Sequence, residues 1–202
     1  MARILIVSNL EGIFIPELWP VIGQRLGIAE LSATTRDTSD FRTLMRYRME
    51  ALQKNNVRFS TIAEVLEGVK PFKGAEAALF KLSSIPEVRC AIISDSFVEF
   101  IDIVLKEKYG WKIFANGLKI NHDIIESCAF DVGGKKADVL KKVKEPSETM
   151  IGIGCSLNDA DMLKETRLKI LFNPVSDLRG RFSDSITCNN IETLVTIIHK
   201  LI

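Results

Sequence analysis

The feature that most constrains the fold is an alternation of short apolar runs with longer amphipathic segments. The short runs are rich in β-branched residues and apolar on successive positions, as strands covered on both faces are. They occupy residues 3–8, 88–94, 149–154, 168–172 and 185–188. The segments between them have helical spacing. Residues 96–110 place one apolar stripe before Gly110, a residue that commonly ends a helix. Strands alternating with helices predict an α/β fold with a doubly wound parallel sheet.

Two regions depart from this alternation. Between residues 17 and 70 the patterns at 17–27, 39–55 and 60–69 are all helical, and they directly follow the first strand. We expect this insertion to cover the carboxyl edge of the sheet. Residues 112–132 instead read as short strands with turns. The expected organisation is therefore a core domain of residues 1–16 and 71–202, with a helical cap of residues 17–70.

Composition excludes several classes of protein. The 202 residues are 47% hydrophobic, and 27 basic side chains balance 26 acidic ones. Such a balance argues against nucleic acid or an anionic membrane as partner. The apolar runs fall short of the roughly 18 residues of a membrane span, and the first is too short for a secretory signal. The four cysteines form no CxxC pair, which argues against structural zinc or a disulfide framework and favours the cytoplasm.

Polar side chains follow three of the predicted strands. In open α/β sheets, ligands bind beyond the carboxyl ends of the strands. These positions hold Asn9 and Glu11 after the first run, Ser94, Asp95 and Ser96 after the second, and Cys155, Ser156, Asn158 and Asp159 after the third. The sequence GGKK at 133–136 opens the helix before the third of these strands. Together with backbone amides at helix starts, these groups predict an anion site.

Five segments, in order along the chain, resemble motifs of the haloacid dehalogenase (HAD) superfamily of phosphotransferases. They are NLEGIFIPELW (9–19), ATTRD (33–37), LMRYR (44–48), IISDSFVEF (92–100) and GCSLNDADML (154–163). Within the superfamily they are most similar to phosphoserine phosphatases, especially the bifunctional phosphoserine phosphatase/homoserine phosphotransferase type. The likeness extends over nearly the whole chain.

The resemblance implies a role for each matching position. In that family an aspartate attacks phosphorus, and a carboxylate two residues later, here Glu11, is the general acid/base. Ser94 and Lys136 (or Lys135, if the match slips by one) would hold the phosphoryl oxygens. Mg²⁺ would lie at position 9, the main-chain carbonyl of Glu11 and position 155, next to Asp159. Glu17, Arg48, Asp95 and Asn158 would contact a small phosphorylated metabolite or inorganic phosphate.

Two positions depart from the family pattern. The nucleophile position is Asn9, whose neutral amide cannot readily form an acyl phosphate, and the metal-ligand aspartate is replaced by Cys155. Mg²⁺ prefers oxygen ligands over soft sulfur. We therefore expect a catalytically impaired protein with weak or absent Mg²⁺ binding. At most it would bind phosphate or a phosphomonoester, weakly, through Ser94, Lys136 and backbone amides.

The same residues also have simpler interpretations. Asn9 could cap a loop after a strand, Ser94 could be a helix N-cap, and Lys136 could be a solvated lysine. Cys155 could be a small buried residue or a reactive thiol. A soft-metal site with Asp159 lacks further ligands, because His122 and His199 lie outside the motifs. By default Glu17 and Arg48 are exposed helix charges.

Two other functions stay open at this stage. One is an active phosphoserine phosphatase or phosphotransferase, with Asn9 either altered from the natural residue or bypassed by other chemistry. The other is a structural or interaction module that binds a protein partner or a second copy of the chain.

Overall fold

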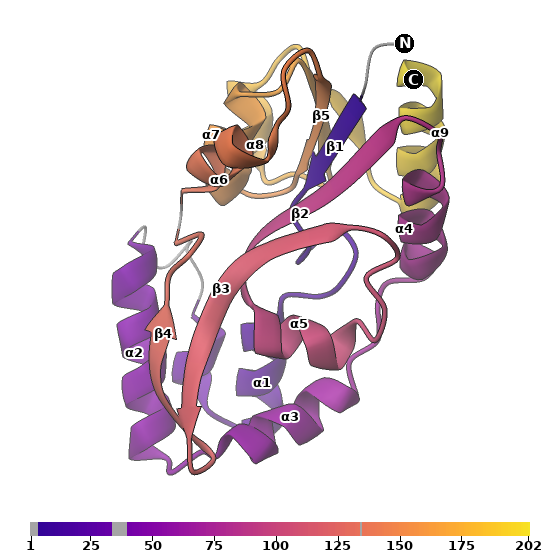
Figure 1. Cartoon of the computed structure of the whole chain (residues 1–202). Helices are drawn as coiled ribbons and strands as arrows, with labels where there is room; N and C mark the ends of the chain where they lie inside the picture. Colours follow the sequence, from indigo (N-terminus) through magenta and orange to yellow (C-terminus); the bar gives the residue numbers. More distant parts are fainter. Residues whose placement is uncertain (1–3, 34–39, 134) are drawn as a thin grey trace.

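The described strands form one seven-stranded sheet in the order β4-β3-β2-β1-β5-β6-β7 (Figure 1). The computed structural model describes residues 4–33, 40–133 and 135–202. The strands are β1 (Ile4–Ser8), β2 (Val88–Phe97), β3 (Lys112–Asn121), β4 (Ile124–Ala129), β5 (Thr149–Gly154), β6 (Leu168–Phe172) and β7 (Ile186–Cys188). All neighbouring strands are parallel except β3 and β4. The predicted α/β fold is confirmed, with one antiparallel edge strand.

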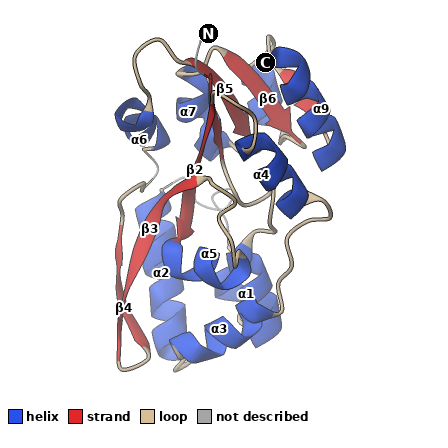
Figure 2. Ribbon diagram, turned by 45° about the vertical axis from the view of Figure 1, so that its right-hand side comes forward, coloured by secondary structure: helices blue, strands red, loops and turns tan. Residues whose placement is uncertain are grey.

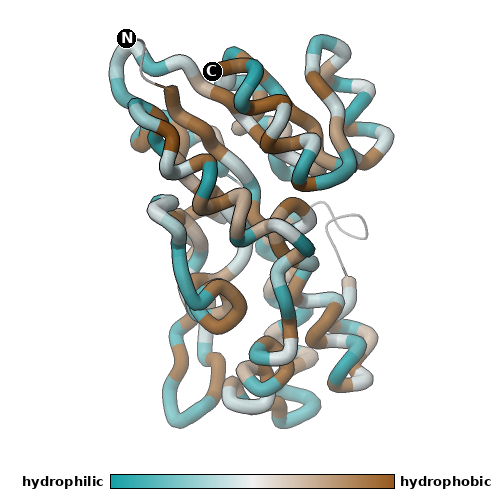
Figure 3. Tube along the Cα trace, turned by 90° about the vertical axis from the view of Figure 1, so that its right-hand side faces the viewer, coloured by the Kyte–Doolittle hydropathy of each residue, from teal (hydrophilic) through white to brown (hydrophobic). Residues whose placement is uncertain are grey.

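Helices cover both faces of the sheet (Figure 2). On one side lie α4 (Ala75–Ser83) and α9 (Ile191–Leu201), and on the other α6 (Lys136–Val143), α7 (Ala160–Lys164) and α8 (Ser176–Arg181). Side chains alternate along a strand, so Ile6 of β1 joins the larger core cluster while Leu5 and Val7 join the cluster around Leu140 and Met162. The outer helices change between hydrophilic and hydrophobic along their length (Figure 3). Among the described helices, none is long and apolar enough to cross a membrane.

A second lobe lies beyond the carboxyl ends of β1 and β2 (Figure 1). It contains α1 (Leu18–Leu26), η1 (Ala29–Ser32), α2 (Phe41–Lys54), α3 (Phe59–Glu67) and α5 (Val98–Val104). The β3–β4 hairpin joins it, because the Phe59 amide donates to the Asp123 carbonyl and the Phe41 and Phe130 rings lie 5.7 Å apart. Of the motif at 33–37, only Ala33 lies within the described residues.

The helix predicted over 96–110 is much shorter in the structure. β2 continues to Phe97, and α5 ends at Val104. The cause is local: the buried stripe stops at Leu105, and residues 106–108 are all exposed. Gly110 is left-handed as expected (φ 79°), although it does not end this helix. Since Ser94 lies inside β2, its interpretation as a helix N-cap is wrong.

Candidate functional site

The carboxyl ends of three strands bring the candidate residues together. Ser8 pairs with Ile92 on one side and with Ile153 on the other, so the residues after these strands reach the same edge. A cleft of about 690 Å³ opens there, between the sheet and the helices α1 and α2. Its lining includes Asn9, Glu11, Glu17, Arg48, Ser94, Asp95, Lys136, Cys155 and Asn158. Asp159 is fully buried, within hydrogen-bond reach of Lys136.

Asn9 contacts the two other groups that the family resemblance assigns to a metal. Its Nδ2 donates to the Glu11 carbonyl at 3.0 Å and lies 3.8 Å from Cys155 Sγ. The Cys155 thiol in turn lies 3.4 Å from the same carbonyl oxygen. The loop is this tight because Gly12 has φ 79° and no side chain: a Cβ there would lie 2.9 Å from Cys155 Sγ. The Asn9 amide, the Glu11 carbonyl and the Cys155 thiol are therefore in direct contact with one another.

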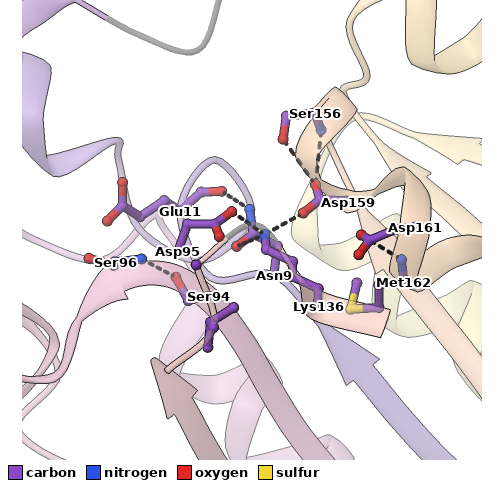
Figure 4. Close-up of polar contacts among 12 residues, drawn as sticks. Asn9, Glu11, Ser94, Asp95, Ser96, Lys136, Ser156, Asp159, Asp161 and Met162 are labelled. Atoms are coloured by element: carbon purple, nitrogen blue, oxygen red, sulfur yellow. Dashed lines mark hydrogen bonds and ion pairs between the residues drawn. The ribbon is translucent and has the colours of Figure 1, made fainter. Parts of the chain in front are cut away.

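Lys136 is a buried ammonium surrounded by oxygen atoms. Its Nζ lies 2.7 Å from Asp159 Oδ1, 3.1 Å from Asp95 Oδ2 and 3.3 Å from Asn9 Oδ1 (Figure 4). Burial alone would lower the pKa of Lys136, but the two carboxylates outweigh it and raise the pKa above its ordinary value. The interpretation as a solvated lysine is therefore wrong for Lys136. It describes Lys135, which is exposed.

The Asp159 carboxylate is held by the start of its own short helix. Its Oδ2 accepts from the amides of Cys155 (2.8 Å) and Ser156 (3.0 Å) and from the Ser156 hydroxyl (3.3 Å). Ser156 and Asp159 form a capping box around η2 (Leu157–Asp159). Asp159 can pack this closely against the end of β5 only because residue 154 is glycine: a Cβ there would lie 2.7 Å from Asp159 Cβ. This carboxylate is therefore fixed before any ligand binds.

The Glu11 side chain points away from Asn9 (Figure 4). Its Oε2 accepts from the Leu18 amide at 3.2 Å, so it caps the first turn of α1. Burial raises the pKa of Glu11, and hydrogen bonding with the Ser96 side chain and the Leu18 amide opposes that shift only in part. The residue predicted as acid/base thus has a structural role in this conformation.

Arg48 and Glu17 both line the cleft. Arg48 is only 6% exposed, lies 4.9 Å from the Trp19 ring and donates to the Ala33 carbonyl, so its default interpretation as an exposed charge is wrong. Burial lowers the pKa of Arg48 to about 10, where it is still charged at neutral pH. Glu17 is exposed at the start of α1.

Sequence reasoning missed part of the lining. Trp19, Phe41 and Leu44 contribute apolar side chains to the lining, and Asp177, an exposed residue of α8, lines it too. The apolar stripes in the sequences of α1 and α2 do predict that these apolar residues are buried. Only the packing of the second lobe decides which of them face the ligand space, so no local pattern could have identified them.

Comparison with solved structures defines the fold class. The chain aligns with a phospho-aspartyl intermediate analogue of phosphoserine phosphatase at a TM-score of 0.79 and 21% identity, covering 98% of this chain and 99% of the other. A phosphoserine phosphatase in apo form aligns at 0.80 and 21% identity, covering 96% and 98%. The fold is that of the HAD phosphatases.

Sequence relatives define the family. Phosphoserine phosphatase ThrH of Pseudomonas aeruginosa is 29% identical over 175 residues, covering 86% of this chain and 84% of the relative. A phosphoserine phosphatase of Pseudomonas syringae pathovar tomato is 30% identical, with 86% and 73% covered. No family model matches the chain. The chain belongs to the phosphoserine phosphatase-like proteins of the HAD superfamily.

Proposed function

We propose that this protein is a catalytically impaired phosphoserine phosphatase-like protein that binds phosphate or a small phosphomonoester. One observation carries the proposal: the group at the nucleophile position is the Asn9 amide, and it is hydrogen-bonded to the Glu11 carbonyl. Removing a covalent nucleophile from subtilisin costs on the order of 10⁶ in rate. That factor corresponds to roughly 8 kcal/mol of activation barrier.

The residues present do not fit Mg²⁺. Among the described residues, no group of three or more His, Cys, Asp or Glu side chains is arranged to hold a metal ion. At the site itself the donors are a neutral amide, one carbonyl and a thiol whose pKa burial raises to about 12, while both oxygens of the Asp159 carboxylate are already bound, by Lys136 and by two backbone amides. Mg²⁺ requires a near-octahedral set of hard oxygen ligands, and a protonated thiol supplies none. These contacts support a metal-independent site.

The other side chains that line the cleft support the proposed ligand. Ser94 and Lys136 lie at the strand edge, and Arg48 and Glu17 offer opposite charges to the rest of a small zwitterionic ligand. We propose that residues 17–70, together with the β3–β4 hairpin, act as the cap over this cleft. All four cysteines are free thiols, which supports a location in the reducing cytoplasm.

An activity assay tests the proposal. Phosphoserine and an aryl phosphate are offered with Mg²⁺ to the wild type and to an Asn9→Asp, Cys155→Asp double variant. We expect negligible turnover by the wild type and measurable turnover by the double variant, with thermal denaturation confirming that both are folded in the Mg²⁺ assay buffer. Robust wild-type turnover would favour an active phosphatase and reject the proposal. An inactive but folded double variant would indicate that the cap no longer fits these substrates.

A further inference from the structure

Asn116 is a buried side chain of β3 that joins two segments of the site. It is 0% exposed and is not part of the cleft lining. Its Nδ2 donates to the Asp95 carbonyl at 2.8 Å, and its Oδ1 accepts from the Val132 and Gly133 amides at 3.0 Å each. One side-chain amide therefore links β2 to the loop that precedes α6.

The link to β2 falls where that strand leaves its regular pairing with β3. β2 advances from residue 93 to 97 while β3 advances only from 114 to 116, so β2 bulges between these points. The bulge carries Ser94 and Asp95, and both line the cleft. A bulge interrupts the hydrogen bonds between the two strands. Here the Asn116 side chain bridges the interruption by binding the Asp95 carbonyl.

The other link holds the segment from which Lys136 starts. The Lys135 amide donates to the Val132 carbonyl at 2.8 Å, and Lys136 is the first residue of α6. The amides of Val132 and Gly133 are the ones that Asn116 binds. The place of the Lys136 ammonium therefore depends on a segment that is anchored to Asn116.

We propose that Asn116 is a positioning residue for the anion site, because it holds the bulge of β2 and the segment before Lys136 in fixed relative positions. The inference rests on the proposed function, in which Ser94 and Lys136 bind oxygens of the same phosphate. Both segments lose their shared anchor if the Asn116 amide is removed. That removal also leaves buried backbone groups unpaired and lowers stability, so ligand affinity has to be measured apart from stability.

Calorimetric titration with inorganic phosphate tests this role. Asn116→Leu keeps the branched shape of the side chain and removes its hydrogen bonds, and we expect it to bind phosphate roughly tenfold more weakly than the wild type. Trp111→Phe is the matched control. It takes the Nε1 donor from another buried carbonyl, that of Leu79, and Trp111 is not part of the cleft lining. Its affinity should stay within about twofold of the wild type, measured where circular dichroism shows all three proteins folded.

The Lys136 ammonium gives a second readout, which loss of stability alone does not change. Its Nζ lies 2.7 Å from Asp159 Oδ1 and 3.1 Å from Asp95 Oδ2, so its ¹⁵N resonance reports how these oxygens surround it. In the ligand-free protein we expect Asn116→Leu to shift this resonance. Trp111→Phe should leave the resonance at its wild-type position.

Each outcome decides the inference. An Asn116→Leu variant that binds phosphate as tightly as the wild type, or that leaves the Lys136 resonance in place, overturns it. An equal loss of affinity in Trp111→Phe does so too. Asn116→Ser, whose hydroxyl is too short to reach both segments, should show the same weakening should Asn116→Leu fail to fold. A wild type that binds no phosphate would instead overturn the proposed phosphate binding itself, and the Lys136 resonance would then decide whether Asn116 holds the lysine in place.

Discussion

At the scale of single residues, Lys136 holds two carboxylates in the interior. Replacing it with methionine removes a buried positive charge that lies within 3.1 Å of a carboxylate oxygen of both Asp159 and Asp95. Breaking a buried ion pair by removing one partner typically costs about 3–5 kcal/mol. We expect Lys136→Met to lower the free energy of unfolding by that amount in urea denaturation. The exposed neighbour Lys135 gives the control. Lys135→Met should change the free energy of unfolding by less than about 0.5 kcal/mol. Equal effects at the two positions would contradict the buried network.

Glu11 gives a pH-dependent prediction at the same scale. Its folded pKa is raised above 4.5 by burial, so the folded protein favours the protonated form. This contribution to stability is fully present below the unfolded pKa and is lost as pH rises through the folded value. Glu11→Gln keeps an acceptor for the Leu18 amide and has no charge to bury. The variant should therefore melt higher than the wild type at neutral pH, and the difference should vanish below pH 4.5.

The control for Glu11 lies on the same loop. Glu17→Gln removes an exposed carboxylate and should leave the melting temperature nearly unchanged across the same pH range. A Glu11→Gln variant that is less stable than the wild type at neutral pH would show that the charged carboxylate is favoured in the fold, contrary to the burial seen here.

At the scale of elements, the β3–β4 hairpin caps a helix of the second lobe. Its two-residue turn, His122 and Asp123, has φ of 46° and 64°, as a type I′ hairpin requires. Asp123 accepts from the Ser60 amide (2.8 Å) and the Ser60 hydroxyl (2.6 Å), so it supplies the cap that α3 lacks from its own residues. These hydrogen bonds lower the pKa of Asp123, so the cap is lost only as pH falls through that lowered value.

Hydrogen exchange tests this cap. Asp123→Ala should make the amides of the first turn of α3 exchange several-fold faster, while the strands β1 and β5 keep their protection. Asp123→Asn should lose less, because asparagine tolerates a positive φ and retains one acceptor oxygen. Unchanged exchange in Asp123→Ala would mean that the hairpin does not hold α3.

Individual helices and strands show which parts of the fold local sequence patterns can predict and which they cannot. Strands were predictable because β-branched apolar runs suit a sheet buried on both faces. α4 escaped prediction although Ala75, Ala78, Leu79 and Leu82 have helical spacing, because alanines give a weak stripe and Phe80, 61% exposed, interrupts it. At the site, the motifs placed Asn9 and Cys155 at one edge. They could not reveal that Asp95 pairs with Lys136, since that contact depends on how β2 and α6 pack together.

At the scale of the whole molecule, the two lobes meet around a site whose own residues satisfy one another. The Asn9 amide, the Glu11 carbonyl and the Cys155 thiol are in contact, and Lys136 balances the carboxylates behind them. A site of clustered carboxylates would need a cation to relieve repulsion between them. Here two of the family's carboxylate positions are uncharged, so the fold is expected to be complete without a metal.

Thermal denaturation with Mg²⁺ or with a chelator tests that expectation without any activity measurement. The wild type should melt at the same temperature in both, because the proposed site offers Mg²⁺ a neutral amide and a protonated thiol in place of two carboxylates. The Asn9→Asp, Cys155→Asp variant places two more carboxylates beside Asp159, so it should be less stable than the wild type in chelator. A ligand at about 100 times its dissociation constant stabilises a fold by about 2.7 kcal/mol, which is roughly 5–10 °C for a chain of this size. Mg²⁺ should raise the melting temperature of the double variant by up to that amount. A wild type stabilised by Mg²⁺ to the same extent would show that Asn9 and Cys155 still leave a metal site, and that the protein is not metal-independent.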